Sequence, residues 1–290
     1  MPVKISFFKT AWQTLWRILV FYLLWAILMA IYFVPFGPKF SAWFKANPVE
    51  ARISGDTISL ITILVATWLV LKFIDRRAFQ TIGFTSRHAV LDIVTGLAVG
   101  SIWLCASLGI AWMFGWAAPI SPIGFSWNVL IVSAISMLFN VAAQELLLCG
   151  FIFQTIRNRS NVIIAIIISA VLFAGYHLGA FKGEWLPAVN VFVAGVFFCI
   201  AYLITNNLWL PIAIHFLWNV LLGPVFGITE SGQSLGSGWK MFSVKGPALF
   251  TGGSFGLEGG LIVTLTTAIT IIFILKFYRQ EIRKLFYGFN

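Results

Sequence analysis

Long apolar stretches separated by short polar segments dominate the chain from about residue 12 to residue 277. A helix that crosses the hydrocarbon core of a membrane needs about 20 apolar residues. Eight stretches approach that length, and their continuous rather than alternating pattern is typical of helices and not of barrel strands. We therefore predict helices over residues 12–34, 57–71, 91–114, 127–156, 162–178, 187–205, 209–222 and 260–277, of which the second is short for a membrane crossing.

Composition agrees with this pattern. The chain has 290 residues, of which 60% are hydrophobic and 10% charged, whereas soluble domains average about 45–50% and about 25%. Only helices and closed barrels satisfy every backbone group in lipid. The predicted fold class is therefore all-α, a polytopic transmembrane bundle of about eight helices in one domain over residues 1–290.

The distribution of basic residues predicts the orientation of this bundle. Lys and Arg concentrate in cytoplasmic loops of membrane proteins. With a cytoplasmic N-terminus and eight crossings, thirteen of the 19 basic residues lie inside and six outside. Both termini are then cytoplasmic. The same explanation accounts for the net charge of +10, and because the basic residues form no single patch, we expect no nucleic acid partner.

Residues 127–222 form the part of the domain that carries chemical motifs, and a Gly-rich loop follows at 223–259. Loops of this length are usually functional or disordered. Its aromatic residues favour a loop that packs back on the bundle. Gly96 and Gly100 form a small-xxx-small pair, which hints at close helix packing.

A single carboxylate stands out within the apolar stretches. Glu145 follows 52 uncharged residues and precedes eleven more, and ionisable groups at membrane depth usually face a bundle interior. His177 and His215 also lie late in apolar runs, and Asn219 shares a helix face with His215. Glu145 and His177 are equidistant from the turn near residue 161, so we expect them to face each other.

This set of side chains suits the hydrolysis of a peptide bond. A carboxylate beside an imidazole can take a proton from water and make it a nucleophile. A second imidazole and an amide can donate hydrogen bonds to the developing oxyanion. We therefore predict Glu145, His177, His215 and Asn219 as catalytic residues, with Gln144 and Phe173 in contact with substrate.

The segments QELLLCG, FAGYH and HFLWN, at residues 144–150, 173–177 and 215–219, resemble the EExxxR, FxxxH and HxxxN motifs of the CPBP family. This family comprises CAAX proteases and bacteriocin-processing proteins, and it is also called Abi. The resemblance implies an intramembrane endopeptidase that acts on hydrophobic or lipidated peptides from within the bilayer. It also suggests a multi-pass protein of a bacterial plasma membrane, with bacteriocin immunity as a related role.

Two positions depart from the family pattern. Gln144 replaces the first Glu, which the family uses as the base, and Cys149 replaces the Arg. Either Glu145 takes over as the base, or the chain is a non-catalytic relative that binds hydrophobic peptides. A proton-coupled carrier is a third possibility, because a buried Glu and His can form a proton relay. The chain shows no repeat of the charged site, however, as an inverted-repeat carrier would.

The leading interpretation requires no cofactor and no metal. Two His and one Glu are also compatible with a zinc ion that keeps one open position, although the chain lacks the HExxH signature. The three cysteines show no CxxC spacing, so we expect neither a disulfide framework nor a cysteine metal site.

Overall fold

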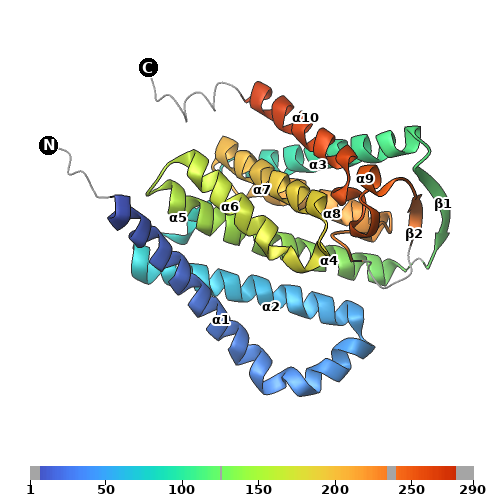
Figure 1. Cartoon of the computed structure of the whole chain (residues 1–290). Coiled ribbons are helices and arrows are strands. Elements are labelled where there is room, and N and C mark those ends of the chain that lie inside the picture. Colours follow the sequence, from blue (N-terminus) through green and yellow to red (C-terminus); the bar gives the residue numbers. More distant parts are fainter. Residues whose placement is uncertain (1–6, 125, 234–239, 279–290) are drawn as a thin grey trace.

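The structure, a computed structural model, describes residues 7–124, 126–233 and 240–278, except for the side chains of residues 7 and 35–40. It is a helical bundle with one small sheet (Figure 1). The main elements are α1 (Phe7–Ala46), α2 (Pro48–Leu69), α3 (Ala89–Met113), β1 (Ala117–Ile123), α4 (Trp127–Glu145), α5 (Gln154–Arg157), α6 (Val162–Tyr176), α7 (Trp185–Thr205), α8 (Trp209–Val220), β2 (Lys240–Val244), α9 (Ala248–Thr251) and α10 (Leu261–Phe277).

The predicted helices are present. In the described part of the chain, five helices are long and apolar enough to cross a membrane, and three shorter apolar helices accompany them. The second helix, predicted over 57–71, runs from Pro48 through a π-helical segment to Asp75. These elements confirm an all-α polytopic membrane bundle. Lys4, Arg279, Arg283 and Lys284, which contribute to the predicted cytoplasmic location of both termini, lie outside the described residues.

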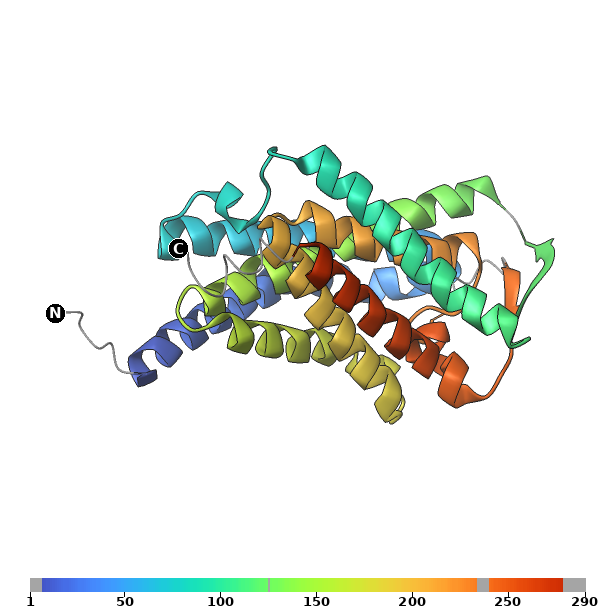
Figure 2. The ribbon, with the colours of Figure 1, turned by 90° about the horizontal axis from the view of Figure 1, so that it is seen from above.

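The helices form a central group with α1 and α2 on one side (Figure 1). The most extensive helix pairs are α3 with α8, α2 with α4, and α6 with α7. Seen from above, α3 crosses over α8, and α10 lies along α7 (Figure 2). Helix α8 therefore lies in the interior, between α3, α4 and α7, which suits a helix that carries candidate catalytic residues.

Two glycines of α3 set the position of α8. A Cβ atom on Gly96 would lie 2.6 Å from the Ala213 Cβ, and one on Gly100 would lie 2.7 Å from the Ile214 carbonyl oxygen. Both distances are too short for a real side chain. The small-xxx-small pair thus permits close backbone contact, as its spacing suggested, and it fixes the α8 residues that directly precede His215.

The described part of the loop after α8 packs back on the bundle, as the sequence predicted. It contains β2, which pairs antiparallel with β1, and neither strand was predicted; β1 lies between the helices predicted over 91–114 and 127–156. The Asn190 amide of α7 donates to the carbonyl oxygens of Glu258 and Gly260 at 2.7 and 3.0 Å. Gly256 has a φ of 96°, and a Cβ there would collide with the Thr229 carbonyl. This turn therefore requires glycine.

Candidate active site

Helix α4 brings three polar side chains to the interior. Asn140 and Gln144 are four residues apart and so share a face, and the Gln144 amide donates to the Asn140 side-chain oxygen at 2.6 Å. Glu145 ends the α-helical part, and a π-helical segment over Leu146–Phe153 continues the helix to α5. π-helical turns are rare and frequently occur at functional sites.

Glu145 pairs with His215. The carboxylate Oε1 lies 2.8 Å from His215 Nδ1, and the two side chains are 1% and 7% exposed. A carboxylate only accepts hydrogen bonds, so Nδ1 of His215 carries the proton. The sequence analysis placed Glu145 opposite His177. The structure instead joins it to His215, because the relation to a turn fixes depth in the membrane and not the direction in which a side chain points.

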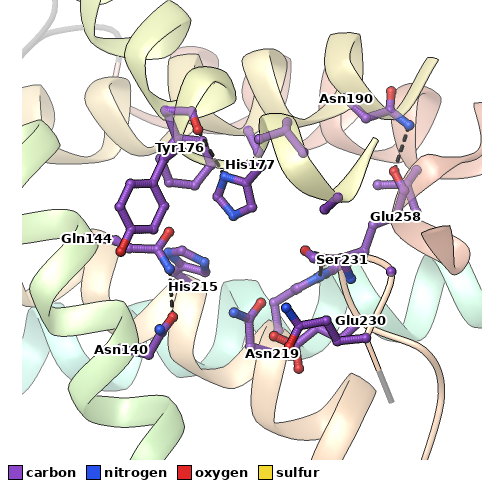
Figure 3. A pocket seen from close by; sticks show the side chains of 18 of the residues that line it. Asn140, Gln144, Tyr176, His177, Asn190, His215, Asn219, Glu230, Ser231 and Glu258 are labelled. Carbon is purple, nitrogen blue, oxygen red and sulfur yellow. Dashed lines mark hydrogen bonds between the residues drawn. The ribbon is translucent and has the colours of Figure 1, made fainter. Parts of the chain in front are cut away.

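His177 directly follows α6 and faces the same space as His215 (Figure 3). Its Nδ1 lies 2.9 Å from the Phe173 carbonyl oxygen. A carbonyl oxygen accepts, so Nδ1 of His177 is also protonated, and Nε2 is the nitrogen left for other partners.

Aromatic rings hold both imidazoles in place. Phe198 of α7 stacks on His215, with ring centroids 4.5 Å apart and planes at 15°. Phe173 packs against His177 at 5.1 Å and against His215 at 5.8 Å. Phe173 therefore lies between the two candidate catalytic rings. In the site it supports the histidines as well as lining the space for a substrate.

A hydrogen-bond chain from α2 orients Gln144. Asp56 accepts from Ser136 Oγ and, at 2.8 Å, from Asn140 Nδ2. Asn140 in turn accepts from Gln144 Nε2. The remaining Gln144 oxygen, Oε1, is buried and has no protein partner. A buried carbonyl oxygen without a partner is costly, so this atom is available to a water molecule or a substrate N–H.

These residues border one cavity of about 530 Å³ (Figure 3). Its inner wall includes Gln144, His177, His215 and Asn219. Asn219 donates from Nδ2 to Met137 Sδ at 3.6 Å, and its second N–H remains for another acceptor. Glu145 does not line the cavity and acts through His215.

Two loop carboxyls, which the sequence analysis did not place in the site, also line the cavity. Glu258 accepts from Trp218 Nε1 at 2.7 Å and from the Ser231 backbone and hydroxyl at 2.7 and 3.0 Å. Glu230 Oε2 is buried without a partner, and burial raises the pKa of Glu230 to about 8. Sequence offered little signal for either residue, because loop carboxylates are usually solvated.

Cys149 lies outside the cavity and is 2% exposed. Its Sγ lies 3.9 Å from Cys199 Sγ. This cysteine is a small apolar residue of the core. No group of three His, Cys, Asp or Glu side chains arranged to hold a metal occurs within the described residues.

Comparison with known proteins bears on the identity of the site. Residues 126–221 match the family described as type II CAAX prenyl endopeptidase, Rce1-like. The comparisons with curated proteins and with solved structures gave no match. The matched segment carries all four residues predicted as catalytic, of which His177, His215 and Asn219 line the cavity and Glu145 contacts His215. The chain is therefore a multi-pass membrane protein whose residues 126–221 are similar to the CAAX prenyl endopeptidases.

Proposed function

We propose that this protein is an intramembrane endopeptidase that hydrolyses a peptide bond in a hydrophobic or lipidated polypeptide. One observation carries the proposal. Two imidazoles border a polar cavity inside an apolar bundle, and the Nδ1 of each is occupied, by Glu145 in one case and by a backbone carbonyl in the other. The two rings therefore present Nε2 for chemistry in different electrostatic settings.

His177 is the proposed general base. With its proton on Nδ1, it offers the Nε2 lone pair to a water molecule in the cavity. Gln144 Oε1, the buried oxygen without a partner, accepts a hydrogen bond from the other O–H of that water and so orients it. The glutamine that departs from the family motif thus has a role that requires no proton transfer. His177 takes one proton as the water oxygen attacks the carbonyl carbon.

His215 and Asn219 form the proposed oxyanion site. In this role His215 acts as an imidazolium that donates to Glu145 from Nδ1 and to the oxyanion from Nε2. The free N–H of the Asn219 amide supplies a second donor. Donors that are already oriented toward the developing negative charge need no reorganisation during the reaction. In the second half of the reaction, His177 returns its proton to the leaving amine as the C–N bond breaks.

The setting of the site indicates the substrate. The cavity lies among helices that expose large apolar side chains on their outer surfaces, which suits a substrate that is held at the membrane by a hydrophobic segment or a lipid group. We propose a lipidated or hydrophobic peptide as the substrate and a bacterial plasma membrane as the location. The mechanism uses side chains alone and no metal.

A non-catalytic peptide-binding protein is the second candidate. The observation in its favour is Gln144, which cannot act as a base where the family pattern has Glu. A binding protein would use the same cavity and the same two imidazoles, but it would release its peptide intact. Cleavage assays separate the two functions directly.

The test uses purified full-length protein and a library of hydrophobic and lipidated peptides, with and without a chelator. His177→Ala should lower the cleavage rate by about 100- to 10,000-fold, as expected for the loss of a general base. His88→Ala is the matched control, because His88 is exposed and lies outside the cavity. Peptide binding without cleavage by the wild-type protein would favour the non-catalytic function.

A further inference from the structure

The cavity opens at one end of the bundle. Its exposed lining residues are Tyr176 and Gly179, at the end of α6 and just beyond it, Lys182 before α7, and Gln233 in the loop after α8. Arg52, near the start of α2, also lies on this rim. The loop is fixed there, because Glu258 holds Ser231 and also the Trp218 indole of α8. These residues form the mouth of the cavity, and the hydrogen bonds of Glu258 hold the loop in place there.

The opposite end of the bundle carries a cluster of arginines. Asp75, at the end of α2, pairs with Arg17 at 2.7 Å, Arg159 at 2.9 Å and Arg77 at 3.4 Å. The Asp75 side chain is 2% exposed. One carboxylate thus forms ion pairs with three guanidinium groups, so this end of the protein keeps a net positive charge. In Figure 1 this end includes α5, and the β1–β2 sheet marks the other end.

Basic residues are distributed unequally between these two ends. Within the described residues, the arginine-cluster end has Lys9, Arg17, Lys72, Arg76, Arg77, Arg87, Arg157, Arg159 and Lys276. The end with the mouth has Lys45, Arg52, Lys182, Lys240 and Lys245. An excess of Lys and Arg in short loops marks the cytoplasmic side, so the arginine-cluster end is the cytoplasmic one.

We infer that the cavity opens to the non-cytoplasmic side of the membrane. The substrate is then a polypeptide that has already been inserted or exported, with its scissile bond near the non-cytoplasmic surface. The identity of this substrate rests on the proposed peptidase function, but the direction of the opening does not. A polypeptide confined to the cytoplasm would have no route to Gln144 and His177 from the mouth.

Cysteine labelling in intact cells tests the direction. Gln233→Cys and Lys182→Cys place a thiol at the mouth, and Arg87→Cys places one in an exposed segment at the opposite end. All three are made in a Cys105→Ser background, because Cys105 is the exposed native cysteine among the described residues. A membrane-impermeant maleimide should label the two mouth variants in intact cells, and Arg87→Cys only after permeabilisation.

Two results would overturn the inference. One is labelling of Arg87→Cys but of neither mouth variant in intact cells. The other is equal labelling of all three, which would mean that the two ends are not on opposite sides. A membrane-impermeant hydrophobic peptide with a charged tag, added to intact cells and to inverted vesicles, then tests the substrate. Cleavage is expected in intact cells, and cleavage only in inverted vesicles contradicts the inferred substrate. If labelling follows the expected pattern and neither preparation cleaves, the peptidase proposal fails and the direction stands.

Discussion

Glu145→Gln is the most direct test of how the buried carboxylate works. The substitution keeps the shape of the side chain and an oxygen that can accept from His215 Nδ1, but it removes the negative charge. The charge centres of a carboxylate and an imidazolium in such a contact are about 4 Å apart. At an effective dielectric constant of about 20, two unit charges at that distance attract each other by about 4 kcal/mol.

In the proposed mechanism this attraction acts on the imidazolium form of His215, which is the form that donates to the oxyanion. Loss of one oxyanion donor typically costs about 100- to 1,000-fold in kcat, or about 2.7–4 kcal/mol, which agrees with the electrostatic value. We expect kcat of Glu145→Gln to fall by that factor with KM nearly unchanged, because the interaction strengthens in the transition state.

The assay is steady-state cleavage by purified protein, with thermal unfolding measured in parallel to establish that the variant is folded. Glu184→Gln makes the same chemical change at an exposed carboxylate and should leave kcat unchanged. A folded Glu145→Gln variant with kcat within tenfold of wild type would remove the carboxylate from the mechanism. An equal loss in Glu184→Gln would show that the effect is not specific to the site.

Three further predictions concern the surroundings of the site. Asn140→Ala, which frees the Gln144 amide, should lower kcat by about tenfold or more because the attacking water loses its fixed partner; an unchanged kcat would refute that positioning role. Burial raises the pKa of Glu230 to about 8, so between about pH 5 and about pH 8 the folded protein binds more protons than the unfolded chain. The free energy of unfolding should therefore fall as pH rises through this range, by at most about 1.4 kcal/mol per pH unit. Thermal unfolding of Glu230→Gln across this range should show a smaller slope, and an identical slope would contradict the assignment. Cys149→Arg should lower Tm because it buries a cation, and Gln144→Glu should partly restore Tm; strictly additive effects in a double-mutant cycle would argue against compensation between the two positions.

The helices could be predicted because lipid leaves the chain few alternatives. Each apolar stretch had to form a helix. The ends of α7, and of the continuous helix that runs from α4 to α5, were predicted to within two residues. Helix α1 is longer than its apolar stretch, and β1 was missed. The strand pairs residues more than 100 positions apart, and such a pairing leaves no local signal in Ala117–Ile123.

The candidate site was predictable in its members but not in its pairing. Glu145, His177, His215 and Asn219 could be identified because polar groups are rare in these helices. The rotation of α4 and α8 about their own axes decides which imidazole Glu145 contacts. The hydropathy of the sequence does not determine that rotation. Asp56 was missed because the apolar stretch that predicted α2 begins at residue 57, directly after it. The helix itself begins at Pro48, so Asp56 lies within α2.

The π-helical segment after Glu145 has a consequence for changes in chain length. An α-helix turns by about 100° per residue, so deleting one residue normally rotates everything beyond it onto the wrong face. A π-helical turn holds one extra residue, and losing that residue restores ordinary α-helical geometry. A single-residue deletion within Leu146–Phe153 should therefore leave Glu145 facing His215 and Gln154 still able to reach the Ile82 carbonyl. This stretch is where the long helix can tolerate a change in its length.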